Sequence, residues 1–284
     1  MNAIDKSKAE LAKYDRAPIK ADPRQLGVST TLKSTSKYLN HPRLREWVMT
    51  EYLRKDGPDF DSYEPVLALY EICNELIDVE QVNSLFRAAR HADPALDRWF
   101  ERGFLGNYSD IGSLATLPEG TLGHTFWREV IDKRDLTPDF LPGFTPTNEW
   151  EYWLRRAQQT HDIHHIVTDC NFDQVAEGRI LAIYLANWMT HLPPALAGQL
   201  LTYNSLISAS GSLRVALHNP EAWLGHRAAQ NEGHVIGTSM APLYLPDWET
   251  MWDRPLEDIR RELGVIQPAQ RVDTLKISEM LQAA

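Results

Sequence analysis

The sequence predicts an all-α fold, in which a polar N-terminal arm over residues 1–40 precedes a single helical domain over residues 41–284 that contains an antiparallel helical hairpin. Apolar residues recur at spacings of three and four along most of the chain, which is the period of an amphipathic helix. No run alternates strictly between apolar and polar residues for more than a few positions, so buried strands are not expected. Proline and glycine fall between the periodic stretches, where helices end.

The expected helices follow from this periodicity and from the residues that punctuate it. Pro94 and Gly103 bracket one short helix, and Pro193 with Pro194 stops a long one. Residues 117–148 are rich in proline and glycine, which predicts a connection with one short helix inside it. In chain order, helices are expected over residues 42–53, 64 to about 91 with a break near Asp78, 94–103, 123–132, 149 to about 167, 174–190, about 195–217, 221–239 and 255–263.

Composition excludes several classes of protein. The formal net charge of -10 argues against nucleic acid as a dedicated partner, because the phosphate backbone would repel the chain. Two cysteines, Cys73 and Cys170, do not make a disulfide framework and fit a reducing compartment. No stretch approaches the roughly 18 consecutive apolar residues of a membrane span, and the first thirty residues do not resemble a signal peptide. A cytoplasmic location is expected, and peripheral contact with the inner face of a membrane stays compatible with it.

The segment that carries chemistry is His161-Asp162-Ile163-His164-His165, followed twelve positions later by Glu177. Four residues separate His161 from His165, so a helix presents both imidazoles on one face. Glu177 would lie about 18 Å away along the same helix, and it therefore reaches the histidines only if the chain reverses. Residues 168–173 are rich in side chains that favour turns, and Asn171 with Gln174 reads as the start of a second helix. In such a hairpin, Glu177 returns level with Ile163.

Two imidazoles and a carboxylate favour a divalent cation. They suit zinc with an open position, or the two-histidine, one-carboxylate arrangement of non-haem iron. Asp162 is a candidate for a fourth ligand or for a group that supports the ligands. Alternatively, the three histidines are ordinary helix-surface residues and Asp162 is a solvated charge. The spacing of Glu177 favours the metal site.

Further candidates surround this hairpin. His164 lies about 100° round the helix from His165, so it points either into the pocket, as a general acid, or into solvent. Arg155 and Arg156 precede His161 by a turn or more, where a guanidinium pairs with a substrate carboxylate or is solvated. His226 and His234 face the metal or lie on a solvated face. An apolar stripe on the second helix lines a lipid channel or is simply core: Ile180, Leu181, Tyr184, Leu185, Trp188 and Met189.

Several separated motifs resemble the coenzyme Q (ubiquinone) biosynthesis protein four family. His161-Asp162-x-x-His165, with eleven residues before Glu177, looks like its metal motif. The segment 117–123 and the residues Thr137-Pro138-Asp139 look like its leader. Residues 152–156 are similar to its arginine-bearing approach to the histidines. The residues of its closing block are Trp223, Gly225, His226, 247–249 and 255–265. The resemblance covers about residues 60–267, in the right order.

The resemblance implies an all-helical homodimer with a divalent cation, zinc first and iron or another cation as alternatives, on His161, Asp162, His165 and Glu177. It implies an enzyme of ubiquinone biosynthesis, a lyase that removes the carboxylate of a polyprenylated 4-hydroxybenzoate-type ring, with hydroxylation at the same ring carbon. His164 and Glu177 are the candidate catalytic residues. Other quinone biosynthesis enzymes, and a long-chain lipid or the polyprenylated substrate, are the implied partners.

The sequence leaves two other functions open and departs from the family pattern once in the hairpin. A lipid-binding scaffold would use the metal to hold the hairpin closed. A metallohydrolase would use the His-x-x-x-His pair, but Asp162 stands where zinc peptidases place a glutamate. The turn after the histidines has Asp169 and Cys170 where a glycine is expected, so the shape of this turn differs from the family pattern.

Overall fold

A computed structural model describes residues 35–55, 64–136, 143–266 and 271–282. Within these residues the chain is helical and forms no β-strand, only an isolated bridge between Thr121 and Pro255, so the all-α prediction is confirmed. The chain divides into two compact units, one up to Asn40 and one from His41 onward. In the first unit the described residues contain α2 (Lys37–Asn40). The predicted arm up to residue 34 and the motif residues 137–139 lie outside the described residues.

The first helices of the second unit lie where capping residues and prolines predict them. They are α3 (Pro42–Leu53), α4 (Glu64–Leu76), α5 (Val79–Ala92) and α6 (Pro94–Arg102). The predicted break at Asp78 is confirmed: its side chain accepts a hydrogen bond from the Gln81 backbone N–H, and Asp78 is thus the N-cap of α5. Gly103 ends α6 with a φ of 54°, the left-handed conformation that glycine adopts without strain.

The middle of the chain carries the hairpin. A 3-10 helix, η4 (Ile111–Thr116), precedes α7 (Leu122–Phe126), which continues as a π-helix, η5 (Trp127–Asp132). Then come α8 (Glu149–Val167) and α9 (Gln174–His191). Trp153 meets Trp188 near one end of the pair, with ring centroids 5.0 Å apart, and His165 meets Glu177 near the other. The two helices therefore run antiparallel, as predicted. Asp173, not Asn171, caps α9, because its carboxylate accepts from two backbone N–H groups.

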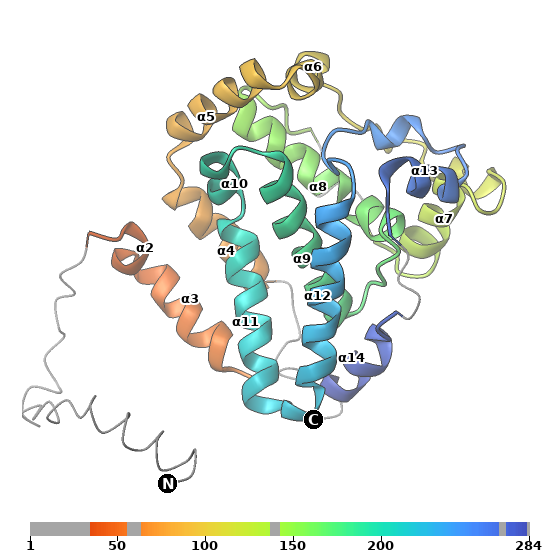
Figure 1. The fold of residues 1–284 in the computed structure, drawn as a ribbon. Helices are drawn as coiled ribbons and strands as arrows, with labels where there is room; N and C mark the ends of the chain where they lie inside the picture. The colour runs from red at the N-terminus through yellow and green to blue at the C-terminus, as the bar shows by residue number, and fades with distance from the viewer. Residues whose placement is uncertain (1–34, 56–63, 137–142, 267–270, 283–284) are drawn as a thin grey trace, which may run out of the picture. The chain divides into compact units, whose positions relative to one another are not determined.

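The remaining elements are α10 (Pro194–Leu200), α11 (Thr202–His218), η6 (Pro220–Ala222), α12 (Trp223–Ser239), η7 (Trp248–Thr250), α13 (Leu256–Leu263) and α14 (Thr274–Gln282). Of these, α10, α11, α12 and α14 pack against α9, whereas α13 packs against α8 (Figure 1). The prediction of one helix over 195–217 was wrong, since the chain bends at Leu201. Gly233 and Gly237 let α12 approach α9 closely: a Cβ on either would lie 2.4 Å from a backbone oxygen of α9.

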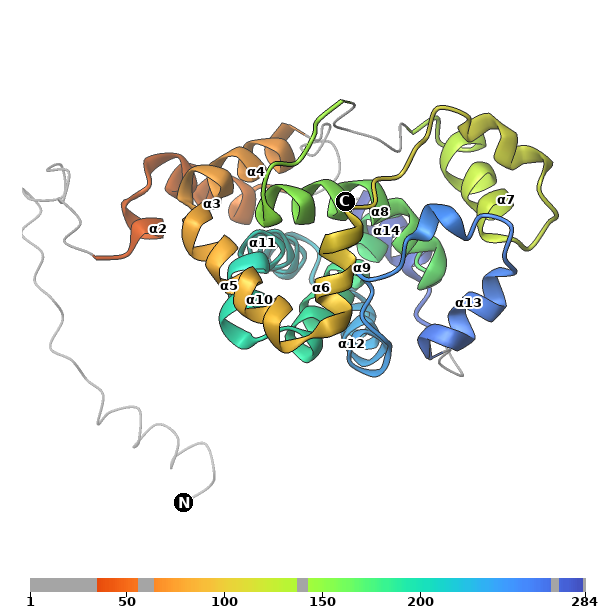
Figure 2. The same cartoon turned by 90° about the horizontal axis from the view of Figure 1, so that it is seen from above.

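Two motifs that are far apart in the sequence meet beside the hairpin. The backbone N–H of Leu122 donates to the Arg254 carbonyl at 2.9 Å, and that of Gly123 donates to the Trp252 carbonyl at 2.8 Å. Figures 1 and 2 both show α7 beside α13. The segment 117–123 and the block after residue 247 thus form one layer against α8. In the part of the chain that the structure describes, no helix is both long enough and apolar enough to span a membrane.

Candidate metal centre

Three side chains from the two hairpin helices converge at one point. His161 and His165 bring their Nε2 atoms to 3.2 Å from each other. Glu177 of α9 places one carboxylate oxygen 3.3 Å from His165 Nε2 and the other 3.5 Å from His161 Nε2. One ligand atom from each of the three residues lies within 4.8 Å of the other two. Glu177 therefore lies between the heights of the two histidines, as the hairpin geometry predicted.

The local sequence explains why the hairpin closes at this register. The backbone N–H of Cys170 donates to the His165 carbonyl at 2.8 Å, which turns the chain directly after the second histidine. Asp169 adopts a φ of 55°, the left-handed conformation for which a glycine was expected, and aspartate tolerates it better than most residues. The Asp173 cap then starts α9 four residues before Glu177.

His165 is held in one orientation from behind. Its Nδ1 lies 2.7 Å from the backbone carbonyl of Asn171, which can only accept a hydrogen bond. Nδ1 therefore carries the proton, and the Nε2 atom of a neutral ring presents a lone pair to the cluster. Phe172 stacks on the same ring, with centroids 4.6 Å apart. This is the arrangement in which a histidine ligates a metal through Nε2.

The spacing of the three donors fits a divalent cation. A tetrahedral ion with bonds of about 2.0–2.1 Å has ligand-to-ligand edges of about 3.3 Å, and an octahedral ion at the same distance has edges of about 2.9 Å. Here the two Nε2 atoms lie 3.2 Å apart, and those of His165 and His161 lie 3.3 and 3.5 Å from different oxygens of Glu177. Two neutral imidazoles and one carboxylate are also the donor set of zinc sites with an open position and of non-haem iron sites. The residues present fit such an ion.

The electrostatics of the cluster favour positive charge. Burial alone lowers the pKa of His161, but the hydrogen bond and charge of Glu177, with the charge of Asp162, raise that pKa to about 9. Burial raises the pKa of Glu177, but the two histidines outweigh it and hold that pKa well below its usual range. The His165 side chain is fully buried, whereas 33% of the His161 side chain and 45% of the Glu177 side chain are exposed. The cluster is therefore buried on the side of His165 and open to solvent on the side of His161 and Glu177.

Two residues of the predicted site lie next to this cluster but outside it. Asp162 is buried, and its carboxylate is not among the three donors that come together, so its assignment as a ligand stays a prediction. His164 points into the core, where its Nδ1 lies 3.0 Å from the Tyr184 hydroxyl and its ring meets Trp248. Burial holds the pKa of His164 well below its usual value, so this ring is neutral.

The two arginines do not have the predicted surroundings. Arg156 is neither solvated nor open to a substrate, because it forms a buried, two-pronged ion pair with Glu249 at 2.7 and 2.9 Å. Tyr108 donates to the same carboxylate at 2.8 Å. Arg155 is also buried. The prediction of a substrate-binding or solvated Arg156 was therefore wrong, and this residue instead joins α8 to the block that follows residue 247.

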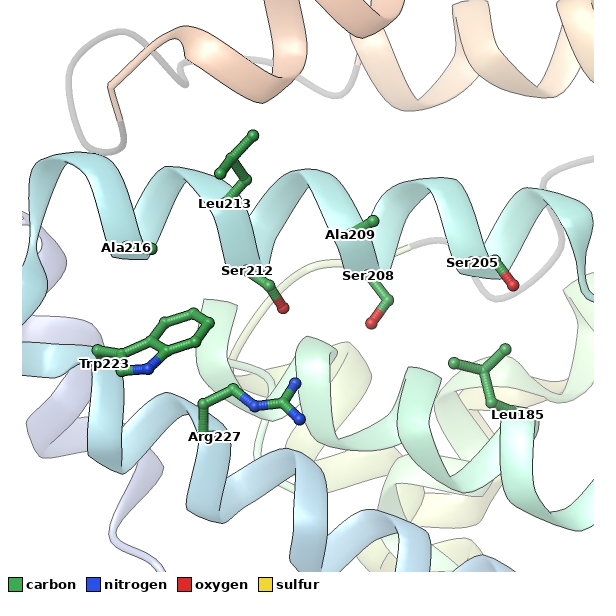
Figure 3. Close-up of a pocket in the computed structure, with 9 residues that line it drawn as sticks. All are labelled: Leu185, Ser205, Ser208, Ala209, Ser212, Leu213, Ala216, Trp223 and Arg227. Atoms are coloured by element: carbon green, nitrogen blue, oxygen red, sulfur yellow. The ribbon is translucent and has the colours of Figure 1, made fainter. Parts of the chain in front are cut away.

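Most of the predicted apolar stripe is core. Ile180, Leu181, Tyr184 and Trp188 belong to the main hydrophobic cluster, whereas Met189 is half exposed. Leu185 lines a surface groove of about 450 Å³ between α11 and α12 (Figure 3). Serine hydroxyls form one wall of this groove, and Figure 3 shows the Arg227 side chain reaching toward them. The residues that line it are Leu185, Ser205, Ser208, Ala209, Ser212, Leu213, Ala216, Trp223 and Arg227.

The two late histidines do not join the metal cluster. His234 is exposed on α12, as the solvated-face interpretation predicted. His226 is buried, and its Nε2 lies 3.3 Å from the Ser212 hydroxyl between α11 and α12. For His226, both the metal-facing and the solvated interpretation were wrong. The residue that sequence reasoning missed is Tyr184, whose hydroxyl lies 3.2 Å from His161 Nδ1. Its place in an apolar stripe gave no sign of this contact.

Comparison with known proteins identifies the family. The model of the family "Coenzyme Q (ubiquinone) biosynthesis protein Coq4" matches residues 106–269, more than half of the chain. The chain belongs to the Coq4 family. The predicted resemblance is thus confirmed, and the family's role is in ubiquinone biosynthesis. The matched residues include the three donors of the cluster and the Arg156–Glu249 pair.

Individual relatives agree with the family model. The chain is 30% identical to "Ubiquinone biosynthesis protein COQ4, mitochondrial" of Eremothecium gossypii, over 56% of this chain and 46% of that protein. It is 27% identical to the Homo sapiens COQ4 homolog, over 58% of each. The chain thus spans about half the length of these curated relatives. Both are named as mitochondrial, so they do not support the predicted cytoplasmic location.

A solved structure shows a similar fold. The crystal structure of a Nostoc punctiforme protein, whose name assigns it provisionally to ubiquinone biosynthesis, matches with a TM-score of 0.57 and 21% identity. The match covers 78% of this chain and 99% of that one. At this level of identity the comparison concerns the fold alone.

Proposed function

We propose that this chain catalyses a metal-dependent step of ubiquinone biosynthesis. In this step, a polyprenylated 4-hydroxybenzoate-type ring loses its carboxylate as carbon dioxide, and the same ring carbon gains a hydroxyl group from an external two-electron oxygen donor. The observation that carries the proposal is the cluster of His161, His165 and Glu177, in a chain of the Coq4 family, with one side open to a ligand.

A divalent cation is part of the proposal, with zinc first and iron as the alternative. His161, His165 and Glu177 would hold it, with Asp162 as a further candidate. When bound, the cation supplies a positive charge that stabilises negative charge developing on a carboxylate or phenolate oxygen. The open side leaves room for such an oxygen, because half of the Glu177 side chain is exposed.

Three protein side chains at or next to the cluster have separate roles in the proposed reaction. His165 is buried and fixed by the Asn171 carbonyl, so it orients the site without moving during turnover. Glu177 is the protein acid that faces the open side, where a ring substrate would lie. His164 is connected to the cluster through the Tyr184 hydroxyl. We therefore assign contact with the substrate to Glu177 and a supporting role to His164.

A lipid-binding scaffold is the second candidate, and the groove between α11 and α12 favours it. Leu185, Leu213 and Trp223 give that groove apolar walls suited to a prenyl or acyl chain. Leu217 and Leu224, on the same two helices, are exposed and offer apolar surface to a partner protein, a second copy or a membrane. In this function the cation would hold the hairpin closed while the lipid is bound without turnover.

Lipid analysis of a host that lacks the gene tests the proposal. Mass spectrometry should find the prenylated ring intermediate with its carboxylate still attached, and this chain should remove the block when supplied in trans. A scaffold would lower several pathway intermediates together, because it acts on other enzymes. Unchanged quinone content in the host without the gene would overturn both functions.

A further inference from the structure

Three polar side chains form a line behind the open cluster, from His161 through Tyr184 to His164. His161 Nδ1 lies 3.2 Å from the Tyr184 hydroxyl, and that hydroxyl lies 3.0 Å from His164 Nδ1. Tyr184 and His164 are both more than nine-tenths buried. Water therefore has little access to these contacts, and each group depends on its neighbour in the line.

The Tyr184 hydroxyl has one proton and lies between two ring nitrogens, so it donates to one and accepts from the other. His164 Nε2 is buried and makes no hydrogen bond within the described residues, so the Tyr184 hydroxyl is the group that orients this ring. When the neutral ring carries its proton on Nε2, the Nδ1 atom of His164 accepts a hydrogen bond from Tyr184.

The direction of the Tyr184 hydrogen bonds determines which ring nitrogen of His161 carries a proton. If Tyr184 donates to His164, then its oxygen accepts the Nδ1–H of His161. The Nε2 atom of His161 then turns its lone pair toward His165 and Glu177. The opposite direction would place a proton on His161 Nε2, between the donors of the cluster, where it would exclude a cation.

We infer that Tyr184, backed by His164, is a positioning residue that holds His161 with its Nε2 free to bind the cation of the cluster. The inference rests on the metal site of the proposed function and adds two residues to it. Each histidine of the cluster then has a hydrogen-bond acceptor at its Nδ1 atom: the Asn171 carbonyl for His165 and the Tyr184 hydroxyl for His161. Groups behind metal-bound histidines typically contribute roughly 10–100-fold to metal affinity.

The test compares the zinc affinity of Tyr184→Phe with that of the unmodified protein. Phenylalanine keeps the ring that stacks on Trp188, with centroids 5.3 Å apart, and removes only the hydroxyl. The matched control is Tyr152→Phe, which removes another buried hydroxyl, one that donates to the Phe104 carbonyl away from the cluster. Competition with a chromophoric chelator should show zinc binding roughly 10–100-fold weaker in Tyr184→Phe and unchanged in Tyr152→Phe.

A second variant tests the direction of the line. In His164→Leu the Tyr184 hydroxyl loses its acceptor, and it then turns to donate to His161 Nδ1. Zinc affinity should fall in this variant too, although His164 does not touch the cluster. A purely local role of Tyr184 predicts no change, so unchanged zinc affinity in His164→Leu would overturn the part assigned to His164.

The exchange rate of the histidine Nδ1 protons with solvent distinguishes loss of the hydrogen bond from a general loss of packing. In the zinc-loaded protein, the Nδ1 protons of His161 and His165 should both be visible by NMR. In Tyr184→Phe only the His161 proton should exchange rapidly, because His165 keeps its bond to Asn171. If the unmodified protein binds no zinc, iron or other divalent cation, the proposed metal site itself fails. If it binds zinc and Tyr184→Phe binds equally well with a protected His161 proton, the positioning role fails and the metal site stands.

Discussion

Replacing Glu177 with glutamine separates a catalytic metal site from a structural one. Glu177 is the α9 residue of the cluster, and 45% of its side chain is exposed. Ion pairs at such exposure contribute about 0–1 kcal/mol to stability. In a domain of about this size, each kcal/mol shifts the melting temperature by about 2–4 °C. Glu177→Gln should therefore lower the melting temperature by about 4 °C or less while it abolishes the reaction.

A structural metal predicts a larger change in stability. A cation present at 100 to 1,000 times its Kd stabilises the folded state by about 2.7 to 4.1 kcal/mol. Its loss would lower the melting temperature by roughly 5–16 °C on the same scale. The two functions therefore differ in the size of the thermal shift as well as in activity.

The measurement is a pair of assays on the same variant. Thermal unfolding with and without a chelator gives the shift, and the quinone content of a complemented host gives the function. Glu80→Gln is the matched control, because Glu80 forms an exposed ion pair with Arg87 at 3.0 Å outside the cluster. It should leave both readouts unchanged. Normal quinone content from a folded Glu177→Gln protein would refute the catalytic assignment and favour the scaffold.

Three further predictions concern the metal, the buried ion pair and the groove. Protein purified without a metal-binding tag should contain about one divalent cation per chain by elemental analysis; a metal-free sample that is folded and active would contradict the site. Glu249→Gln should lower the free energy of unfolding in urea by about 3–5 kcal/mol, because it leaves the Arg156 charge buried and unpaired. The double variant Arg156→Met with Glu249→Leu should lower it much less. Equal losses of stability in the two variants would contradict this reasoning. Native mass spectrometry should show a prenyl or acyl lipid that Ser208→Trp, on the groove wall, displaces; an adduct that persists in Ser208→Trp would place the lipid elsewhere.

Helices whose ends are marked by local side chains were predictable from the sequence. The predicted range 42–53 coincides with α3, which follows an N-cap at His41 and starts with Pro42. The start of α8 follows Asn148, whose side chain accepts from the Glu151 backbone. The hairpin was predictable for the same reason, because the spacing of its ligands and its turn lie within a few residues of each other.

Elements held by distant contacts were not predictable. The buried polar residues of α14 are Thr274 and Ser278, whose hydroxyls donate to the Asp173 carboxylate at 2.7 and 2.5 Å. The apolar period of α14 is short, being limited to Ile277, Met280 and Leu281, so sequence reasoning predicted no helix there. The ion pair of Arg156 was not predictable either, since its partner Glu249 lies 93 residues later in the chain. Nothing near Arg156 in the sequence identifies a buried carboxylate.

The turn without a glycine shows how a distant motif supports the site. Asp169 keeps the left-handed backbone that glycine would give, and its carboxylate pairs with Arg260 and Arg271. Arg260, in the closing block of the family motif, also donates to the carbonyls of Ile166 and Val167 at 2.7 and 3.1 Å, the last residues of α8. The last carbonyls of a helix have no partner within it, and the Ile166 carbonyl also accepts from the Asp169 backbone N–H at 3.1 Å. The closing block therefore caps the helix that carries His161 and His165 directly after the second histidine, so two motifs that are about ninety residues apart in the sequence act on one turn.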